Sequence, residues 1–173
     1  MLIPDQEILF KKWLNEYKKL IFKVVKTYAE LPQDIDDLFQ EILLQLWISI
    51  PNFLGHAKET TWIYRVALNT ALVWKRSEKR KRHKNNFLEL EKISLTKEDL
   101  DIHSQNQQIL EHVYDSIRQL SKSESSILLL YLDGLSYDEI ANILGISKNY
   151  VGVRLNRAKK NLAQLLKGII DDF

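Results

Sequence analysis

A short stretch near the C-terminus, from Ser136 to Gly145, constrains the fold of this chain most strongly. Ser136 can accept a hydrogen bond from the backbone three residues on while Glu139 reaches back, so the pair predicts the start of a helix. Gly145 suits the left-handed turn that ends a helix, because it has no Cβ. Ser147 then caps a further helix. Two helices joined by so tight a turn predict a helix-turn-helix.

The helix that would follow Ser147 is basic and carries no carboxylate. Val151 and Leu155 recur at helical spacing and predict its buried face. The outward face and its flanks then carry the candidate duplex-DNA contacts: Lys148, Asn149, Tyr150, Gly152, Val153, Arg154, Asn156, Arg157 and Lys160. No acidic residue occurs between Ile140 and Ile170, so this helix suits a polyanion such as DNA. The alternative interpretation is an ordinary amphipathic hairpin with a solvated basic face.

The rest of the chain also follows helical spacing. Glycine and proline are scarce, with five and three copies in 173 residues, and strand-like alternation is missing. We therefore expect an all-α protein. A break in periodicity predicts two small helical domains, at 1–84 and 105–173, joined by a linker at 85–104. The linker is mostly acidic and polar, with Glu89, Glu91, Glu98, Asp99 and Asp101.

Composition excludes several classes of function. The absence of cysteine removes disulfides and thiolate metal sites and fits a reducing cytosol. Neither a signal peptide nor a membrane-spanning stretch is visible, so we expect a cytoplasmic protein without membrane insertion. The four histidines have no metal-ligand spacing, and no catalytic or cofactor-binding motif occurs, so we expect no enzyme, metal or cofactor. These histidines are His56, His83, His103 and His112.

Helices are predicted from near Asp5 to about Glu30 and from about Asp34 to Pro51. The second helix carries a continuous apolar stripe: Ile35, Leu38, Phe39, Ile42, Leu43, Leu46 and Ile50. Its opposite face holds Asp37, Gln40, Glu41, Leu44 and Ile48. Two bulky aliphatic residues on a polar face indicate a surface for a partner. The alternative is that they are single exposed apolar side chains, which are common.

A third helix is predicted from a cap at Thr60 or Thr61 to at least Arg76. Its core positions are Ile63, Val66, Ala67, Thr70, Ala71 and Trp74. A separate row of Trp62, Arg65 and Asn69 suits single-stranded nucleic acid, because bases stack on aromatic rings and arginine holds phosphate. The alternative is a buried tryptophan beside ordinary surface residues. The basic run 75–84 extends the same helix and favours phosphate contact.

The C-terminal half begins with two more predicted helices. The first resumes near Gln105 and places apolar side chains on one face, namely Ile109, Val113, Ile117 and Leu120. The second is capped by Ser121 or Ser123 and ends at Asp133-Gly134. Together with the helix-turn-helix they complete the predicted second domain.

Two blocks of this sequence resemble a known family. Residues 37–47, Phe53 and the run 61–71 ahead of a basic segment resemble region two of bacterial RNA polymerase sigma factors. Residues 134–147 and 151–159 resemble region four. The two blocks occur in order across nearly the whole chain. That layout is similar to the small two-domain sigma factors of the extracytoplasmic-function (ECF) type within the sigma-70 family.

The resemblance implies a role for each surface. The outward face of the second helix would dock on the clamp helices of core RNA polymerase, through Asp37, Gln40, Glu41, Leu44 and Ile48. The third helix and the loop before it would open and read the promoter minus-ten element as single strand, through Phe53, Thr61, Trp62, Arg65, Asn69, Lys75 and Arg76. The recognition helix would read the minus-thirty-five element as duplex. An acidic linker in the RNA exit channel and an anti-sigma partner are also implied.

One departure from the family pattern falls on the recognition helix. The family usually carries lysine or arginine where this chain has Gly152, and a small polar residue where it has Val153. Two other functions remain alternatives: a stand-alone helix-turn-helix regulator whose N-terminal half senses or dimerises, and a sigma-like decoy that binds a regulator without DNA. The row of Trp62, Arg65 and Asn69 favours the sigma factor, because a protein that binds only duplex has no use for it.

Overall fold

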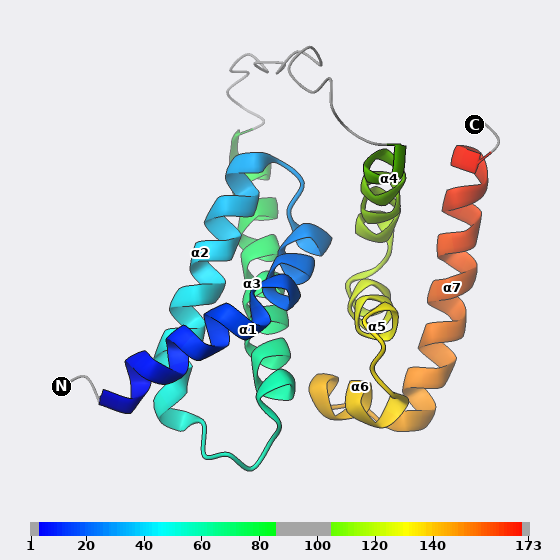
Figure 1. Cartoon of the computed structure of the whole chain (residues 1–173). Helices are drawn as coiled ribbons and strands as arrows, with labels where there is room; N and C mark the ends of the chain where they lie inside the picture. The colour runs from blue at the N-terminus through cyan, green and yellow to red at the C-terminus, as the bar shows by residue number, and fades with distance from the viewer. Residues whose placement is uncertain (1–3, 86–104, 171–173) are drawn as a thin grey trace.

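The computed structural model describes residues 4–85 and 105–170, and every regular element within them is a helix (Figure 1). This confirms the prediction of an all-α fold with two small helical domains. The N-terminal domain contains α1 (Pro4–Tyr28), α2 (Pro32–Ser49), the short 3-10 helix η1 (Ile50–Asn52) and α3 (Glu59–Asn85). The C-terminal domain contains α4 (Gln105–Gln119), α5 (Lys122–Leu132), α6 (Tyr137–Leu144) and α7 (Lys148–Ile170).

Several sequence features lie beyond the part of the chain that the structure describes. The acidic residues of the predicted linker fall between the described segments, and His103 does so as well. Within the described residues, no helix combines the length and the apolar character needed to cross a membrane.

The N-terminal core is built where the apolar periodicity predicts it. Leu38, Ile42 and Leu46 of α2 are fully buried, and α3 buries Ile63 and Ala67 against them. Trp13 of α1 is also fully enclosed. The three helices therefore form one tightly packed unit, whose remaining surfaces are available for other contacts.

Two helix starts differ from the sequence prediction. Helix α2 begins at Pro32 instead of Asp34, because a proline in the first turn needs no hydrogen bond from its nitrogen. The prediction that Thr60 or Thr61 caps α3 is wrong. The amide of Trp62 donates to the carbonyl of Lys58 at 3.1 Å, so the helix begins earlier, at Glu59, and Thr61 lies in its first turn.

The caps of the C-terminal domain are confirmed. Ser121 and Glu124 form a capping box at the start of α5, and Ser136 with Glu139 forms another at α6. Gly145 has a φ of 67°, in the left-handed region, and its amide donates to the carbonyl of Ala141. These local signals position α7 at a fixed angle to α6, as a helix-turn-helix requires.

The apolar face predicted for α4 is only partly buried. Ile117 and Leu120 are enclosed, whereas Ile109 is half-exposed. Ile109 is exposed because only the C-terminal half of α4 packs against other helices, while its first turns extend beyond them.

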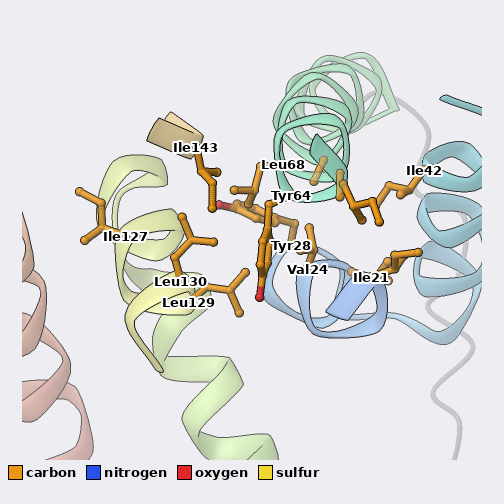
Figure 2. Close-up of a cluster of buried hydrophobic side chains, with 14 of the residues drawn as sticks. Ile21, Val24, Tyr28, Ile42, Tyr64, Leu68, Ile127, Leu129, Leu130 and Ile143 are labelled. Carbon is orange, nitrogen blue, oxygen red and sulfur yellow. The ribbon is translucent and has the colours of Figure 1, made fainter. Parts of the chain in front are cut away.

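The two domains pack against each other along an interface that we call the seam (Figure 2). Its N-terminal side includes Tyr28, Tyr64 and Leu68, and its C-terminal side includes Leu130 and Ile143, all of them buried. Helix α1 contacts α4 and α5, and α3 contacts α6 (Figure 1). The chain therefore adopts a closed arrangement in which the helix-turn-helix rests on α3.

Candidate nucleic-acid interface

The outer face of α7 is open to solvent. Val151 and Leu155 are fully buried, and this orientation turns the opposite side of the helix outward. The nine predicted duplex-DNA contacts are exposed, apart from Gly152 and Arg154, which are half-exposed. Val153 is 69% exposed, which is unusual for an aliphatic side chain in the middle of a helix. The geometry therefore presents a complete helix face to a ligand.

Two of the cations on α7 are held at the sides of this face. Lys148 pairs with Asp138 of α6 at 2.8 Å. Arg154 donates from Nε to the hydroxyl of Tyr150 at 2.7 Å, and its guanidinium carbon lies 4.9 Å from the centroid of that ring. These contacts order two long side chains that would otherwise be mobile.

Arg157 has a structural contact that the sequence did not predict. Its Nε lies 3.4 Å from Oε1 of Glu124, a carboxylate that is almost completely buried. The same oxygen accepts a hydrogen bond from Asn161 at 3.0 Å, and the other oxygen accepts from the amide of Ser121. Glu124 thus joins the start of α5 to the middle of α7. No signal in the sequence distinguishes this glutamate from an ordinary capping residue.

The predicted row on α3 is only partly accessible. The indole nitrogen of Trp62 donates to the hydroxyl of Ser49 at 3.1 Å, and its ring lies 5.6 Å from that of Phe53. Phe53 in turn packs edge-on against Trp13. Trp62, Phe53 and Thr61 are all half-buried, so the interpretation of a packed tryptophan fits the closed chain.

Arg65 is covered by the C-terminal domain. Its guanidinium donates twice to the carbonyl of Asn142 in α6, at 3.1 and 2.5 Å. Beside it, Lys58 forms an ion pair with Glu139 at 3.1 Å. The backbone amide of Ser136 and the charge of Lys58 lower the pKa of Glu139. Helix α6 therefore covers the guanidinium of Arg65 in the closed chain.

Asn69 lies apart from its two predicted companions. It is exposed and lines a cavity of about 470 Å³ between α2 and α3. The other residues around this cavity are Glu41, Gln45, Thr70, Val73, Trp74 and Ser77. In the closed chain the row thus consists of a packed tryptophan, a covered arginine and an open asparagine.

The basic positions at the middle of α3 lie near the seam. The Lys75 ammonium lies 5.6 Å from the centroid of the Tyr28 ring. Burial lowers the pKa of Lys75, and the nearby charges of Lys79, Lys122 and Arg118 lower it further. Arg76 is exposed and lines a cavity of about 270 Å³ between α3 and the C-terminal domain. The packing of the two domains therefore brings positively charged side chains of α3 and of the C-terminal domain close together, and such a cluster favours contact with an anion.

The outer face of α2 has the exposure that its sequence predicts. Leu44 and Ile48 are 50% and 54% exposed, and Asp37 and Gln40 are exposed beside them. Glu41 is half-exposed and accepts a hydrogen bond from Gln45 at 3.0 Å. This face contributes no side chain to the buried core, so it is available to a partner.

The polar contacts of the seam were missed by the sequence analysis. The hydroxyl of Tyr64 donates to Asp133, which also pairs with Lys23 of α1. Tyr28 and Ser126 share a hydrogen bond of 2.6 Å between their hydroxyls. Asp133 was predicted only as the end of a helix. No group of metal-ligating side chains occurs among the described residues.

Comparison with known proteins assigns the chain to a family. A model of Sigma-70 region 2 matches residues 13–81, and a model of Sigma-70 region 4 matches residues 110–162. The chain is 30% identical over 164 residues to the RNA polymerase sigma factor YlaC of Bacillus subtilis, covering 90% of this chain and 88% of YlaC. It is 25% identical over 169 residues to the ECF RNA polymerase sigma-E factor of Haemophilus influenzae, covering 93% of this chain and 89% of that factor.

A solved structure shares the fold. The sigma factor RpoE, in complex with the anti-sigma factor NepR from Bartonella quintana, matches with a TM-score of 0.70 and 19% identity, over 91% of this chain and 96% of that one. The chain belongs to the sigma-70 family of RNA polymerase sigma factors. Within that family it is of the ECF type and serves promoter-specific transcription initiation, with regions two and four forming its two domains.

Proposed function

We propose that this sigma factor binds core RNA polymerase through the outer face of α2 and directs it to promoters through two separate DNA surfaces. The observation that carries the proposal is the exposure of Leu44 and Ile48 on a helix whose core stripe is already complete. An apolar centre among Asp37, Gln40 and Glu41 has the anatomy of a protein docking surface. Its presence in the same chain as a helix-turn-helix whose helix α7 carries no acidic residue supports a protein that links polymerase to DNA.

The two DNA surfaces serve different forms of the promoter. Helix α7 reads the minus-thirty-five element as duplex, because its exposed face suits the major groove. Helix α3 and the loop before it read the minus-ten element as single strand, through Arg65 and Asn69 in particular. The domains that carry these surfaces are residues 1–84 and 105–173, joined by the linker at 85–104.

In the closed arrangement, reading of the minus-ten element by α3 depends on opening of the seam. Because the carbonyl of Asn142 holds the guanidinium of Arg65, a single strand cannot reach this arginine until the seam opens. Docking of α2 on the polymerase, together with binding of α7 to duplex DNA, provides the free energy for opening. We also propose an anti-sigma partner that binds the closed chain, because the structural neighbour RpoE is in complex with one.

The test is co-elution of the full chain with core RNA polymerase, followed by run-off transcription from a pool of promoter fragments. Wild-type protein should co-elute and support transcription. Leu44→Asp should weaken co-elution at least tenfold and leave the melting temperature unchanged, because Leu44 is half-exposed. The matched control is Ile8→Asp, an aliphatic side chain on α1 that is 67% exposed and lies outside the proposed face.

The outcomes separate the candidate functions. Wild-type chain that binds duplex DNA but neither co-elutes nor transcribes would be a stand-alone regulator, and the proposal would be wrong. A large fall in the melting temperature of Leu44→Asp would show that Leu44 belongs to the core. Equal loss of co-elution in Ile8→Asp would mean that the docking surface is not confined to α2.

A further inference from the structure

The centre of the exposed face of α7 is made of short side chains. Asn149, Gly152, Val153 and Asn156, which we call the reading stripe, follow one another at helical spacing. Asn149, Val153 and Asn156 are exposed, and neither asparagine amide has a hydrogen-bond partner among the described residues. The stripe stays open in the closed chain, so it needs no rearrangement before it meets a ligand.

Three long cations, Lys148, Arg154 and Arg157, lie beside the reading stripe and not within it. Lys148 is paired with Asp138, Arg154 is stacked on Tyr150, and Arg157 contacts the buried Glu124. Each contact directs the charge toward the flank where a phosphate backbone would pass. A side chain held in this way must give up its partner before it can reach a base at the centre of the groove.

Gly152 has no packing reason to lack a side chain. A Cβ at this position would meet only the Tyr137 ring, at 3.6 Å, which is an ordinary contact distance. Glycine inside a helix nevertheless costs about 1 kcal/mol relative to alanine. Glycine in such a place allows another molecule to approach the backbone closely. The missing side chain therefore widens the space in front of the stripe.

The groups that remain in the stripe match one class of base pair. An asparagine amide can pair with both N6 and N7 of adenine in the major groove, and an exposed apolar side chain packs against the methyl group of thymine. Guanine is most often read by arginine or lysine. Among the described residues of the first three turns of α7, every such cation has a partner at the flank.

We propose that the reading stripe recognises A·T base pairs, with Asn149 and Asn156 pairing with adenines and Val153 packing on a thymine methyl group. Arg154 and Arg157 hold the phosphates at the side, and the exposed Lys160 continues the line of the stripe one turn beyond Asn156. This inference rests on the proposed function only in requiring that α7 enters the major groove of duplex DNA. It adds the chemical identity of the sequence that the groove must present.

The experiment begins with selection of duplex DNA from a random pool by the immobilised full chain at low salt. The enriched duplexes should share a core of A·T pairs. One such duplex is then made with uracil in place of each core thymine, which removes only the methyl group. Uracil at the position that faces Val153 should weaken binding about fourfold, the effect of losing one buried methyl-sized group.

Variants identify the residues responsible. Val153→Ala should bind the thymine and uracil duplexes equally, and Asn149→Ala should lose about tenfold of the preference for adenine at one position. The control is Val73→Ala, which removes a similarly exposed valine from α3 and should behave as wild type. Circular dichroism of each variant establishes that α7 is still folded.

Several results would overturn the inference. Enrichment of a G·C core, with no change in binding when uracil replaces thymine, would show that the arginines read the bases. The proposed function would still hold in that case if the chain supports transcription with core polymerase. If Val153→Ala still binds the thymine duplex more tightly than the uracil duplex, by the same factor as wild type, then Val153 does not contact the thymine methyl group. A pool without enrichment would show that the open stripe selects no sequence. Failure of the wild-type chain to co-elute with polymerase and to transcribe contradicts the proposed function instead.

Discussion

The two candidate DNA surfaces of this sigma factor differ in whether the free chain exposes them. The reading stripe of α7 is open, and its side chains have few contacts with the protein. On α3, by contrast, Arg65 is bound to α6 and Trp62 is packed against Phe53. A surface for duplex DNA can be permanently exposed because duplex is always present, whereas a surface for single strand has a ligand only after the promoter opens. The seam covers Arg65 of the second surface and leaves the first surface open.

The largest expected effect comes from placing a charge in the seam. Leu68→Glu should separate the domains, because burying an unpaired carboxylate at this enclosed position costs about 3 kcal/mol or more, which opening relieves. Small-angle X-ray scattering should report a larger radius of gyration with unchanged helix content, and affinity for single-stranded DNA should rise. The control is Leu44→Glu on the exposed face of α2. Loss of helix content in Leu68→Glu would instead place Leu68 in the core of the N-terminal domain.

High pH should open the seam as well. Burial raises the pKa of Tyr28 to about 12, and burial together with the Asp133 carboxylate raises that of Tyr64. Both hydroxyls are therefore neutral in the closed chain, and their contribution is complete below the ordinary tyrosine pKa near 10. For Tyr28 it is lost as the pH rises toward 12, by about 2 to 3 kcal/mol, and the raised pKa of Tyr64 adds to this loss.

Tyrosinate absorbance and scattering followed across the same titration check this expectation. The two signals should change together, and Tyr28→Phe with Tyr64→Phe should remove the shared transition. If all tyrosines titrate near their ordinary pKa with no change in shape, the two hydroxyls are not enclosed in solution.

Asp133 should contribute less than the apolar contacts do. Asp133→Asn weakens the hydrogen bond from Tyr64 and removes the ion pair with Lys23, and we expect a loss of about 2 kcal/mol from the closed state. Most of this belongs to Tyr64, because the Lys23 ammonium is half-exposed and screened by solvent. A double-mutant cycle with Tyr64→Phe measures the coupling, and Asp138→Asn outside the seam is the control. If the free-energy changes of Asp133→Asn and Tyr64→Phe are additive in the double variant, the two side chains do not interact in solution.

The smallest expected effect concerns the open surface. Gly152→Ala should stabilise the C-terminal domain by up to about 1 kcal/mol, because alanine favours the helix and the new methyl group meets no close neighbour. Calorimetry should show a rise in melting temperature of about 2 to 4 °C. If the reading stripe needs close approach of the backbone, the same change weakens duplex binding, whereas Gly168→Ala does not. A lower melting temperature would mean that Gly152 is required by packing.

Sequence reasoning predicted the local features of this fold. The capping boxes at Ser121 and Ser136 and the left-handed Gly145 depend on neighbours within a few residues, so their chemistry is visible in the chain. The core stripe of α2 was also predicted, because one face of a helix repeats at fixed spacing. The exposed face of α7 follows from the same rule, once Val151 and Leu155 are assigned to the core.

The seam could not be predicted in this way. Tyr64 and Leu68 lie on α3 beside a core stripe that is complete without them, so periodicity gives no reason to bury a second face. The partner of Tyr64 is Asp133, which is 69 residues away, and helical spacing carries no information about such a pair. For the same reason the sequence showed Arg65 as exposed, although α6 covers it.

The most direct test of a closed free chain that opens on polymerase is energy transfer between dyes on Val73→Cys of α3 and Leu132→Cys of α5. The chain has no cysteine of its own, and both positions are exposed. We predict high transfer in the free protein, a fall when core RNA polymerase is added, and a fall also in Leu68→Glu without polymerase. Low transfer in the free wild-type chain, or high transfer that core polymerase leaves unchanged, would contradict the account.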